Sequence, residues 1–373
     1  MREFCRRAGL DYDKSIVDGP SFEPEIRVVQ YDTRNERHFK SFYDLYLAEM
    51  IDDGFDFHWV DGANSIYSAE LYHRYLSEGT GKRPLVLNRQ QNYTLCNHRY
   101  PAGFSGDTYA TWATMRRTVE VTLKGGNNGV WWSHDIGGHL FGKGDQELYL
   151  RWLQFGVFSP VNRLHSNNKS MSKEPWNYPQ VESVAEDFMR LRHRLLPYLY
   201  TANVRTAKDG VPLVCPLYYY VKDKNAYAKR WRNEYFFGEQ MLVCPVVKRG
   251  KNGATKMKIR LPEGNWTHFF SGVKFVGDRE YEIECPLDQY PVFVKDGGIV
   301  PLLDVCKEDK LNCKDFKNLT VKIYPGENSY TMYDETGFVA FDMRKADGGY
   351  ALTVTPSDDC KTVSYTHLTL PTN

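Results

Sequence analysis

Short apolar runs alternate with longer segments of helical apolar spacing over roughly residues 38–205. The runs at 55–60, 84–87 and 129–132 are strand-like in length and pattern. This alternation is typical of βα units, so we expect a parallel sheet covered by helices. The helical patterns fall on residues 39–51, 70–76, 111–123, 147–155 and 181–207, and Gly210 is the expected stop of the last one.

After Gly210 the pattern changes to short strand-like runs separated by Gly, Pro and Asn. Such spacing is typical of antiparallel β-sandwiches, and the charged segment 303–315 is the expected seam between two of them. The last ten residues, SYTHLTLPTN, continue neither pattern, so we expect a non-native tail outside the fold. The predicted divisions are an α/β domain in 1–210, a proximal β-sandwich in 211–303, a distal, partial one in 304–363, and the tail in 364–373.

The composition excludes several classes of protein. Lys and Arg total 48 against 47 Asp and Glu, so the formal charge of +1 gives no electrostatic footprint for nucleic acid or anionic lipid. No run approaches the ~20 apolar residues of a membrane helix. The eight cysteines are scattered without a C-x-x-C pair, which argues against structural zinc and favours reduced, mostly buried thiols. The aromatic share of 14% suits a protein that stacks rings on a flat ligand such as a sugar.

Four polar motifs lie where the predicted strands end on their carboxyl side. In a (β/α) barrel, side chains at these ends line the active-site face, whereas the strand bodies fill the interior. Any single Asp among them could be a helix cap or a turn residue, but four repeats of the arrangement favour a shared site. The motifs are DFHWVDGAN (56–64), GFSGDT (103–108), WWSHDIGGH (131–139) and FSPVNRLHS (158–166).

Two other motifs point to different chemistry and fail on inspection. GGHLFGK (137–143) has the spacing of a phosphate-binding loop, but Gly144 stands in place of the Ser or Thr that would hold Mg²⁺. In GFSGD, the second glycine falls one residue too early for the turn that exposes a nucleophilic serine. The carboxylates therefore stay the best candidates for the chemistry.

A longer series of motifs runs in a fixed order along the chain. Together they resemble glycoside hydrolase family 31, whose members are retaining α-glycosidases such as α-glucosidases and α-xylosidases. The resemblance covers roughly residues 40–340 and implies the C-terminal part of a (β/α)₈ TIM barrel followed by two small antiparallel β-sandwich domains. The motifs are WVD (59–61), RYPAGFSGD (99–107), WWSHDIGG (131–138), ELYLRWLQFGVFSPVNRLHS (147–166), EPW (174–176), NEYFFGEQMLVCPV (233–246), WTHFFSG (266–272) and PLDQYPVFVKDGGIVPL (286–302).

The resemblance also assigns the catalytic residues. It makes Asp61 of W-x-D the nucleophile and Asp107 of GFSGD the general acid/base. Arg89 in VLNRQ corresponds to the family's subsite arginine. The chain departs from the family at one point, because it reads WVDGAN where many members read W-x-D-M-N-E. The glutamate of that motif is missing, so the motif does not indicate the aglycone specificity, but the nucleophile is in place.

Five further residues match the family's sugar-binding positions. Asp135 and His165 correspond to groups that hold sugar hydroxyls. The other three match or replace aromatic residues of the pocket wall; they are Trp59, Phe104 and His139.

The expected chemistry explains why these residue types are needed. Retention requires two carboxyl groups about 5–5.5 Å apart, one ionised to attack the anomeric carbon and one protonated to give the leaving oxygen its proton. Asp61 must therefore stay ionised, and burial and nearby negative charge must keep the proton on Asp107. Arg89, Asp135 and His165 would fix the sugar ring through its hydroxyls. No metal and no cofactor are required.

The resemblance implies that part of a whole enzyme lies outside these 373 residues. Family members carry an N-terminal β-sandwich and a complete barrel whose fourth strand ends at the nucleophile, whereas Asp61 lies close to the start of this chain. The first residues, MREFCRRAGLDYD, also lack the apolar stretch of a signal peptide. We therefore expect an N-terminally truncated fragment that is weakly active or inactive alone.

The leading interpretation is an α-glucosidase-like hydrolase that removes terminal α-linked sugars from oligosaccharides. α-Xylosidase, α-N-acetylgalactosaminidase and transglycosidase activities use the same carboxylates and stay open. A non-catalytic carbohydrate-binding fragment is the alternative from another class, and the presence of both Asp61 and Asp107 argues against it. The expected partner is an oligosaccharide or another α-glycoside, with no nucleic acid and no membrane.

Overall fold

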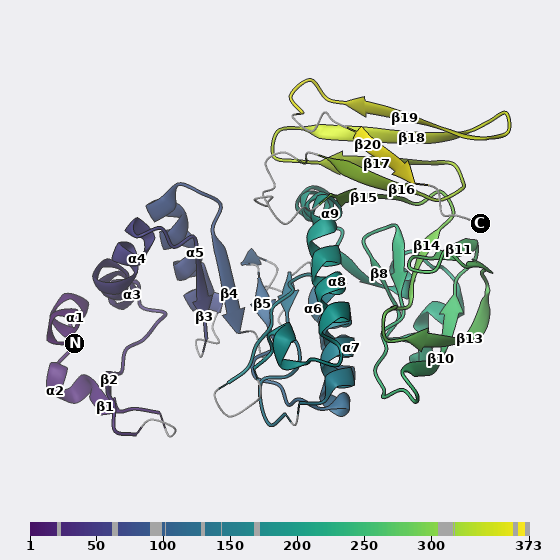
Figure 1. Cartoon of the computed structure of the whole chain (residues 1–373). Helices are drawn as coiled ribbons and strands as arrows, with labels where there is room; N and C mark the ends of the chain where they lie inside the picture. Colours follow the sequence, from purple (N-terminus) through teal and green to yellow (C-terminus); the bar gives the residue numbers. More distant parts are fainter. Residues whose placement is uncertain are drawn as a thin grey trace. The chain divides into compact units, whose positions relative to one another are not determined.

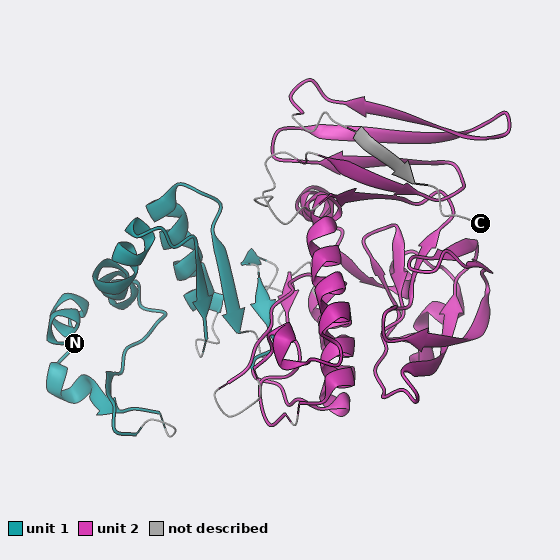
Figure 2. Ribbon diagram, viewed as in Figure 1, with its two compact units in different colours: residues 1–106 teal, residues 107–373 magenta. Residues whose placement is uncertain are grey.

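The computed structural model describes residues 1–20, 24–61, 66–89, 99–100, 102–127, 131–142, 144–167, 172–304, 316, 318–360 and 365–369. The chain forms two compact units, residues 1–106 and 107–373 (Figure 2). The boundary falls inside the GFSGD motif. Asp61 and Arg89 therefore belong to the first unit, and Asp107, Asp135 and His165 belong to the second.

The first unit begins with short helices and an antiparallel pair of strands, β1 and β2. A continuous helical segment follows, in which Phe39 and Leu47 pack against Leu71 and Tyr75. The elements of this unit are α1 (Arg2–Ala8), α2 (Tyr12–Ser15), β1 (Ile16–Asp18), β2 (Arg27–Val29), α3 (Glu36–Phe42), the π-helical turn η1 (Tyr43–Leu47), α4 (Ala48–Asp52), β3 (Phe57–Val60), α5 (Ile66–Thr80), β4 (Leu85–Arg89) and β5 (Gly103–Phe104) (Figure 1).

Three parallel strands position the site residues of the first unit. β3 pairs with β4 and β4 pairs with β5, and α5 is the crossover between β3 and β4. Val60 lies opposite Asn88 in this register, so Asp61 and Arg89, the next residues along the two strands, emerge side by side. The predicted βα unit with parallel strands is confirmed here.

The second unit opens with the remaining helices of the α/β part. These are α6 (Trp112–Asn127), α7 (Gln146–Val157), α8 (Glu182–Arg194) and α9 (Leu196–Asp209), with the short strand β6 (Trp132–Ser133) and the 3₁₀ turn η3 (Pro175–Asn177). Asp145 caps the start of α7, because its side chain accepts a hydrogen bond from the amide of Leu148. Residues 148–157 of α7 are all buried.

The single helix predicted over residues 181–207 is wrong in one respect, because the structure forms two helices that meet at Leu195. Pro197 has no amide hydrogen for a helix that would continue from α8, but it suits the first turn of α9. α9 ends at Gly210 as predicted, in the left-handed conformation with φ 70°.

A six-stranded sheet in the order β12-β11-β14-β9-β8-β7 faces the antiparallel pair β10–β13. Leu242 and Phe293 of the sheet share one core with Ile259 and Leu261 of the pair, which makes this a β-sandwich. Its elements are β7 (Val214–Pro216), η4 (Leu217–Tyr219), η5 (Lys224–Tyr227), η6 (Lys229–Trp231), β8 (Tyr235–Phe237), β9 (Met241–Val243), β10 (Ala254–Leu261), β11 (Asn265–His268), β12 (Lys274–Val276), β13 (Arg279–Pro286) and β14 (Val292–Lys295).

The distal strands form two three-stranded sheets, β15-β16-β20 and β17-β18-β19. β20 lies within the predicted tail and pairs in parallel with β16, so this sheet is not wholly antiparallel. Most of the seam predicted at 303–315 lies outside the described residues. The elements are β15 (Ile299–Leu303), β16 (Leu319–Ile323), β17 (Asn328–Tyr333), β18 (Phe338–Ala346), β19 (Gly349–Pro356) and β20 (Tyr365–Thr369).

One large core joins the parts of the second unit. It runs from α6 and α7 to the distal strands through the face of the six-stranded sheet that points away from β10 and β13, and it includes Met115, Trp152, Val243, Val321 and Phe341. The helices next to the site loops, α6 and α7, therefore pack against the strands of the sandwich. Hydrophobic burial over such a continuous core is the main stabilising term of a fold like this.

Two further expectations concern the described residues. None of the helices there is both long and apolar enough to cross a membrane. Cys5, Cys215, Cys244 and Cys285 are buried thiols outside any disulfide, as predicted.

Candidate active site

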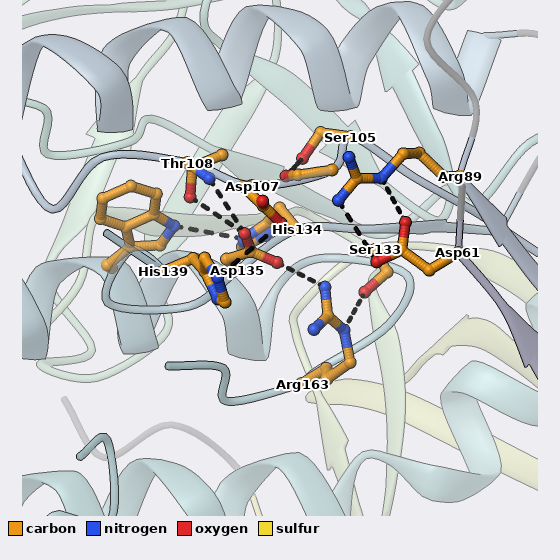
Figure 3. A network of polar contacts seen from close by, with 12 residues as sticks. Asp61, Arg89, Ser105, Asp107, Thr108, Ser133, His134, Asp135, His139 and Arg163 are labelled. Atoms are coloured by element: carbon orange, nitrogen blue, oxygen red, sulfur yellow. Dashed lines mark hydrogen bonds and ion pairs between the residues drawn. The ribbon is translucent and has the colours of Figure 1, made fainter. Parts of the chain in front are cut away.

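Asp61 and Arg89 form an ion pair at the carboxyl ends of β3 and β4. Nε of Arg89 lies 2.6 Å from Oδ1 of Asp61, and Nη2 donates a hydrogen bond to Oδ2 at 3.3 Å (Figure 3). The planar guanidinium thus faces both carboxylate oxygens, which fixes the direction of the carboxylate. The side chain of Asp61 is 50% exposed, so its oxygens stay open to a ligand.

Two aromatic residues extend this group within the first unit. Phe104 is buried opposite Arg89 in the β4–β5 register, and Cζ of Arg89 lies 5.7 Å from the centre of its ring. Trp59 is exposed and meets Phe104 edge to face, with the ring centroids 5.8 Å apart. The structure therefore brings together Trp59, Asp61, Arg89 and Phe104, four of the eight predicted site residues.

Asp135 is fully buried in the second unit and is held from two sides (Figure 3). Its Oδ1 accepts a hydrogen bond from Nη2 of Arg163 at 2.6 Å. Its Oδ2 accepts from the amide of Thr108 at 3.1 Å and from the Thr108 hydroxyl at 3.3 Å. Arg163 in turn donates through Nε to the hydroxyl of Ser133 at 3.0 Å. This network fixes the position of the Asp135 carboxylate.

Asp107, His139 and His165 lie next to this carboxylate. Nε2 of His139 is 3.9 Å from Oδ1 of Asp107, and the rings of His139 and His165 stack with centroids 4.4 Å apart. Polar atoms of Asp107, Asp135, His139 and His165 all lie within 4.8 Å of one another. We name these four residues the Asp107–His165 cluster. Such a spacing lets several side chains reach neighbouring hydroxyl groups of one small ligand.

The side chain of Asp107 is 42% exposed, which differs from the burial expected of a proton-holding acid. Asp107 follows Gly106, which has φ 77°, in the irregular segment between β5 and α6. A ligand that covers this carboxyl would remove it from water. The exposed Asp107 carboxyl is therefore accessible to a ligand, and a bound ligand would complete its surroundings.

Glycines bring the loops of the second unit into close contact. Gly138 has φ 81°, and a Cβ added there would lie 2.4 Å from Cα of Ala110. Gly137 has φ 86°, and its Cβ would meet the buried chain of Lys173. The amides of His139 and Leu140 both donate to the carbonyl of Thr108 at 2.8 Å. The DIGGH sequence therefore places His139 against the segment that carries Asp107.

The environment shifts the pKa of two histidines near this cluster. Burial is the main cause that lowers the pKa of His165, and the charges of Arg163 and His139 lower it further while Asp135 and Asp107 oppose them. Burial also lowers the pKa of His134 to about 3, with smaller contributions from Arg163 and Arg192. Both imidazoles are therefore favoured in the neutral form, in which each can donate and accept hydrogen bonds.

A metal ion is a possible occupant of the Asp107–His165 cluster by residue type, since carboxylates and imidazoles are common ligands. However, both oxygens of Asp135 already accept hydrogen bonds, and one of the donors is the Arg163 guanidinium. A cation bound to Asp135 would face this positive charge at close range. The donor set fits the hydroxyls of a neutral ligand better than it fits a metal.

Two family models match the chain. The TIM-barrel domain of glycosyl hydrolases family 31 matches residues 62–202, and the C-terminal domain of glycosyl hydrolase family 31 matches residues 210–300. The chain belongs to glycoside hydrolase family 31. The fold class predicted from the sequence, part of a TIM barrel followed by β-sandwich domains, is confirmed with it.

Curated family 31 relatives cover most of the chain. An α-xylosidase of Saccharolobus solfataricus is 29% identical over 290 residues, which are 75% of this chain and 38% of the relative. α-Glucosidase 2 of Bacillus thermoamyloliquefaciens is 29% identical over 273 residues, which are 72% and 33% of the two chains. This chain thus spans about a third of the length of these relatives.

The solved structures also include family 31 members. A dextranase of Flavobacterium johnsoniae, complexed with glucose, has a TM-score of 0.75 to this structure and 23% sequence identity. The match covers 95% of this chain and 50% of the dextranase. It shows that the family 31 fold is shared.

The family 31 site residues predicted from the sequence thus form two groups, one in each unit. The roles assigned to them, and the separation of about 5–5.5 Å expected between the carboxyl groups of Asp61 and Asp107, stay predictions. Sequence reasoning missed Arg163, which the structure binds directly to Asp135. The alternation of side chains in R-L-H was the available signal, because residues 163 and 165 of an extended segment point to the same side.

Proposed function

We propose that this chain carries the catalytic part of a retaining α-glycosidase that removes terminal α-linked sugars from oligosaccharides. Membership of glycoside hydrolase family 31 supports the proposal, as do relatives named α-xylosidase and α-glucosidase. The observation that carries it is the Asp107–His165 cluster, in which a half-exposed carboxyl lies beside a buried, hydrogen-bonded carboxylate and two stacked imidazoles.

In the first half-reaction, a carboxylate oxygen of Asp61 attacks the anomeric carbon as the bond to the glycosidic oxygen breaks. Asp107 gives its proton to that oxygen, and the shortened sugar leaves as an alcohol. Arg89 holds the attacking carboxylate through both of its oxygens, which restricts the carboxylate to one orientation. A sugar–Asp61 ester of inverted configuration results.

In the second half-reaction, Asp107 accepts a proton from a water molecule, whose oxygen attacks the anomeric carbon as the ester bond to Asp61 breaks. The second inversion restores the α-configuration, and both carboxyl groups return to their starting states. One residue serves as acid and then as base, so its accessibility matters in both steps. The half-exposed side chain of Asp107 meets this requirement.

Asp135 and His165 are proposed to bind the hydroxyls of the sugar that is transferred. Asp135 is buried and fixed by Arg163 and Thr108, so it needs no reorganisation when a hydroxyl approaches. The neutral imidazole favoured at His165 can both donate and accept a hydrogen bond. Hydroxyl contacts of this kind strengthen as positive charge develops on the sugar ring.

α-Xylosidase activity is the second candidate, because the Saccharolobus solfataricus relative that covers 75% of this chain carries that name. The two activities share the proposed mechanism and differ in whether the sugar carries a hydroxymethyl group at C5. Comparison of kcat/KM for 4-nitrophenyl α-glucoside and α-xyloside separates them.

A trapping experiment tests the proposed nucleophile. In 5-fluoro-α-glucosyl fluoride the anomeric fluoride is a good leaving group, and the ring fluorine slows hydrolysis of the ester that forms. One turnover suffices, so a slow chain is labelled as well. We expect mass spectrometry to find one glycosyl adduct, on the peptide that contains Asp61.

Asp61→Ala is the control and should show no label. A label on another carboxylate, or none on the wild-type chain after prolonged incubation, would contradict the proposal. In the case of a non-catalytic binding fragment, glucose would bind and no adduct would form.

A further inference from the structure

Two exposed aromatic rings stack on each other close to the Asp107–His165 cluster. Tyr109 is 53% exposed and Phe141 is 71% exposed. Their ring centroids lie 5.6 Å apart at an interplanar angle of 20°. At this separation the rings overlap only in part, so much of each face stays open. Tyr109 follows Asp107 by two positions, and Phe141 follows His139 by two.

The backbone holds this pair in place at an energetic cost. Phe141 has φ 55°, a left-handed conformation that is strained for a residue with a side chain. An exposed Phe gains no core burial that would offset the strain. Strained residues that persist in a fold are concentrated at ligand sites, where the strain positions a side chain.

Backbone contacts fasten the segment of Phe141 to the segment of Tyr109. Tyr109 and Leu140 form a parallel β-bridge, and the amide of Ala110 donates to the carbonyl of Leu140 at 2.9 Å. The carbonyl of Thr108 accepts from the amides of His139 and Leu140. Both rings are therefore carried by the same short loop pair that carries Asp107 and His139. Their positions relative to the acid are built into the backbone.

We propose that the Tyr109–Phe141 pair is a sugar subsite that stacks on the unit at the leaving-group side of the scissile bond. The inference deepens the proposed function, because it rests on the acid/base role of Asp107. A general acid contacts the glycosidic oxygen, and the leaving sugar begins at that oxygen. Tyr109 and Phe141 each lie two residues from Asp107 or His139. They are therefore placed to contact the sugar unit next to the scissile bond, and not a more distant unit of the oligosaccharide.

The chemistry of the pair suits a sugar ring. One face of a pyranose presents C–H groups, which pack on the negative face of an aromatic ring. The Tyr109 hydroxyl adds a polar group at the edge for a sugar hydroxyl. A stacking surface of this kind selects ring shape and not a single hydroxyl pattern, so the pair should accept glucose units in more than one linkage.

Saturation-transfer NMR tests the proposal without the need for turnover. The probes are glucose and an α-linked glucose trisaccharide, each added to the full chain with saturation of the aromatic protons. For the wild-type chain we expect transfer to the C–H protons of a leaving-side unit of the trisaccharide. In Tyr109→Ala/Phe141→Ala this transfer should be lost, and the Kd for the trisaccharide should rise about fivefold or more, the size expected of one or two aromatic contacts.

Two variants serve as controls. Phe141→Trp keeps a ring and should retain transfer, whereas Tyr227→Ala removes another ring of the second unit that is 71% exposed and should change nothing. Unchanged transfer in the double variant, or equal losses in Tyr227→Ala, would overturn the inference. Failure of the proposed function would give a different result. In that case the wild-type chain would show no saturation transfer to glucose and no covalent label on Asp61.

Discussion

The indole N–H of Trp152 donates a hydrogen bond to Nδ1 of His134 at 3.2 Å, in the fully buried centre of the second unit. Because Nδ1 accepts this bond, the proton of the neutral imidazole must be on Nε2, where it points to the hydroxyl of Ser159 at 3.0 Å. The Ser159 hydroxyl in turn donates to the carbonyl of Phe155 at 2.8 Å. The chain of donors is complete only while His134 is neutral.

This arrangement predicts a loss of stability in acid. The pKa of His134 falls from 6.5 to about 3 in the folded state, mainly through burial. The unfolded chain therefore binds a proton at His134 at a pH where the folded chain does not, so the free energy of unfolding falls as the pH drops from about 6.5 towards 3. The expected slope is about 1.4 kcal/mol per pH unit.

Urea unfolding between pH 7 and pH 5 measures this slope. His134→Gln should be less stable than the wild type at pH 7 but should lose about 2 kcal/mol less over the interval. His193→Gln, at an exposed histidine, is the control and should follow the wild type. Parallel curves for the wild type and His134→Gln would show that His134 does not carry the effect.

The ion pair between Arg163 and Asp135 predicts a coupled effect on stability. Arg163→Met should lower the free energy of unfolding by about 3 kcal/mol, because it leaves the buried Asp135 carboxylate without its cation. In Arg163→Met/Asp135→Asn the buried charge is gone, so the double variant should be more stable than the sum of the two single effects predicts. Additive losses in urea unfolding would mean that the pair is not coupled.

The sequence predicted much of the fold because its signals were local. The 3.6-residue spacing of residues 147–155 predicted α7, and Gly210 was the correct end of α9. The break at Leu195 was missed because apolar spacing continues through it. Pro197 was the available signal, since proline lacks the amide hydrogen that a continuous helix needs.

The candidate site was only partly predictable for a similar reason. Asp61, Asp107, Asp135 and His165 stand in motifs with a chemical meaning. Arg163 acts through a contact with Asp135, 28 positions away, and no local pattern reports such a contact. Likewise, the strained backbone of Phe141 arises from the way two loops are joined and has no counterpart in composition or periodicity.

The loop that carries His139 depends on Gly138, and a matched pair of substitutions tests this. Gly138→Ala imposes a left-handed conformation on a residue with a side chain and drives Cβ to 2.4 Å from Cα of Ala110. Gly348→Ala imposes the same conformation, with φ 80° against 81°, but its Cβ meets nothing within 4 Å. Gly348→Ala should therefore lower the free energy of unfolding by about 1 kcal/mol.

Gly138→Ala should lower the free energy of unfolding by clearly more than Gly348→Ala does. It should also weaken glucose binding, because His139 and Asp107 are displaced. Urea unfolding and a glucose titration followed by NMR measure the two effects. Equal losses in both alanine variants would mean that the contact between Gly138 and Ala110 relaxes freely.

Azide distinguishes the roles proposed for Asp61 and Asp107 by the configuration of the product. Asp107→Ala should still form the Asp61 ester from α-glucosyl fluoride, which needs little acid assistance, but it should hydrolyse the ester about 10²- to 10⁴-fold more slowly. Azide needs no general base, so it should attack the accumulated ester and give α-glucosyl azide. Asp61→Ala cannot form the ester, so azide should displace fluoride directly and give β-glucosyl azide. NMR of the anomeric proton separates the two products. The same anomer from both variants, or no product from either, would contradict a division of labour between a nucleophile at 61 and an acid/base at 107.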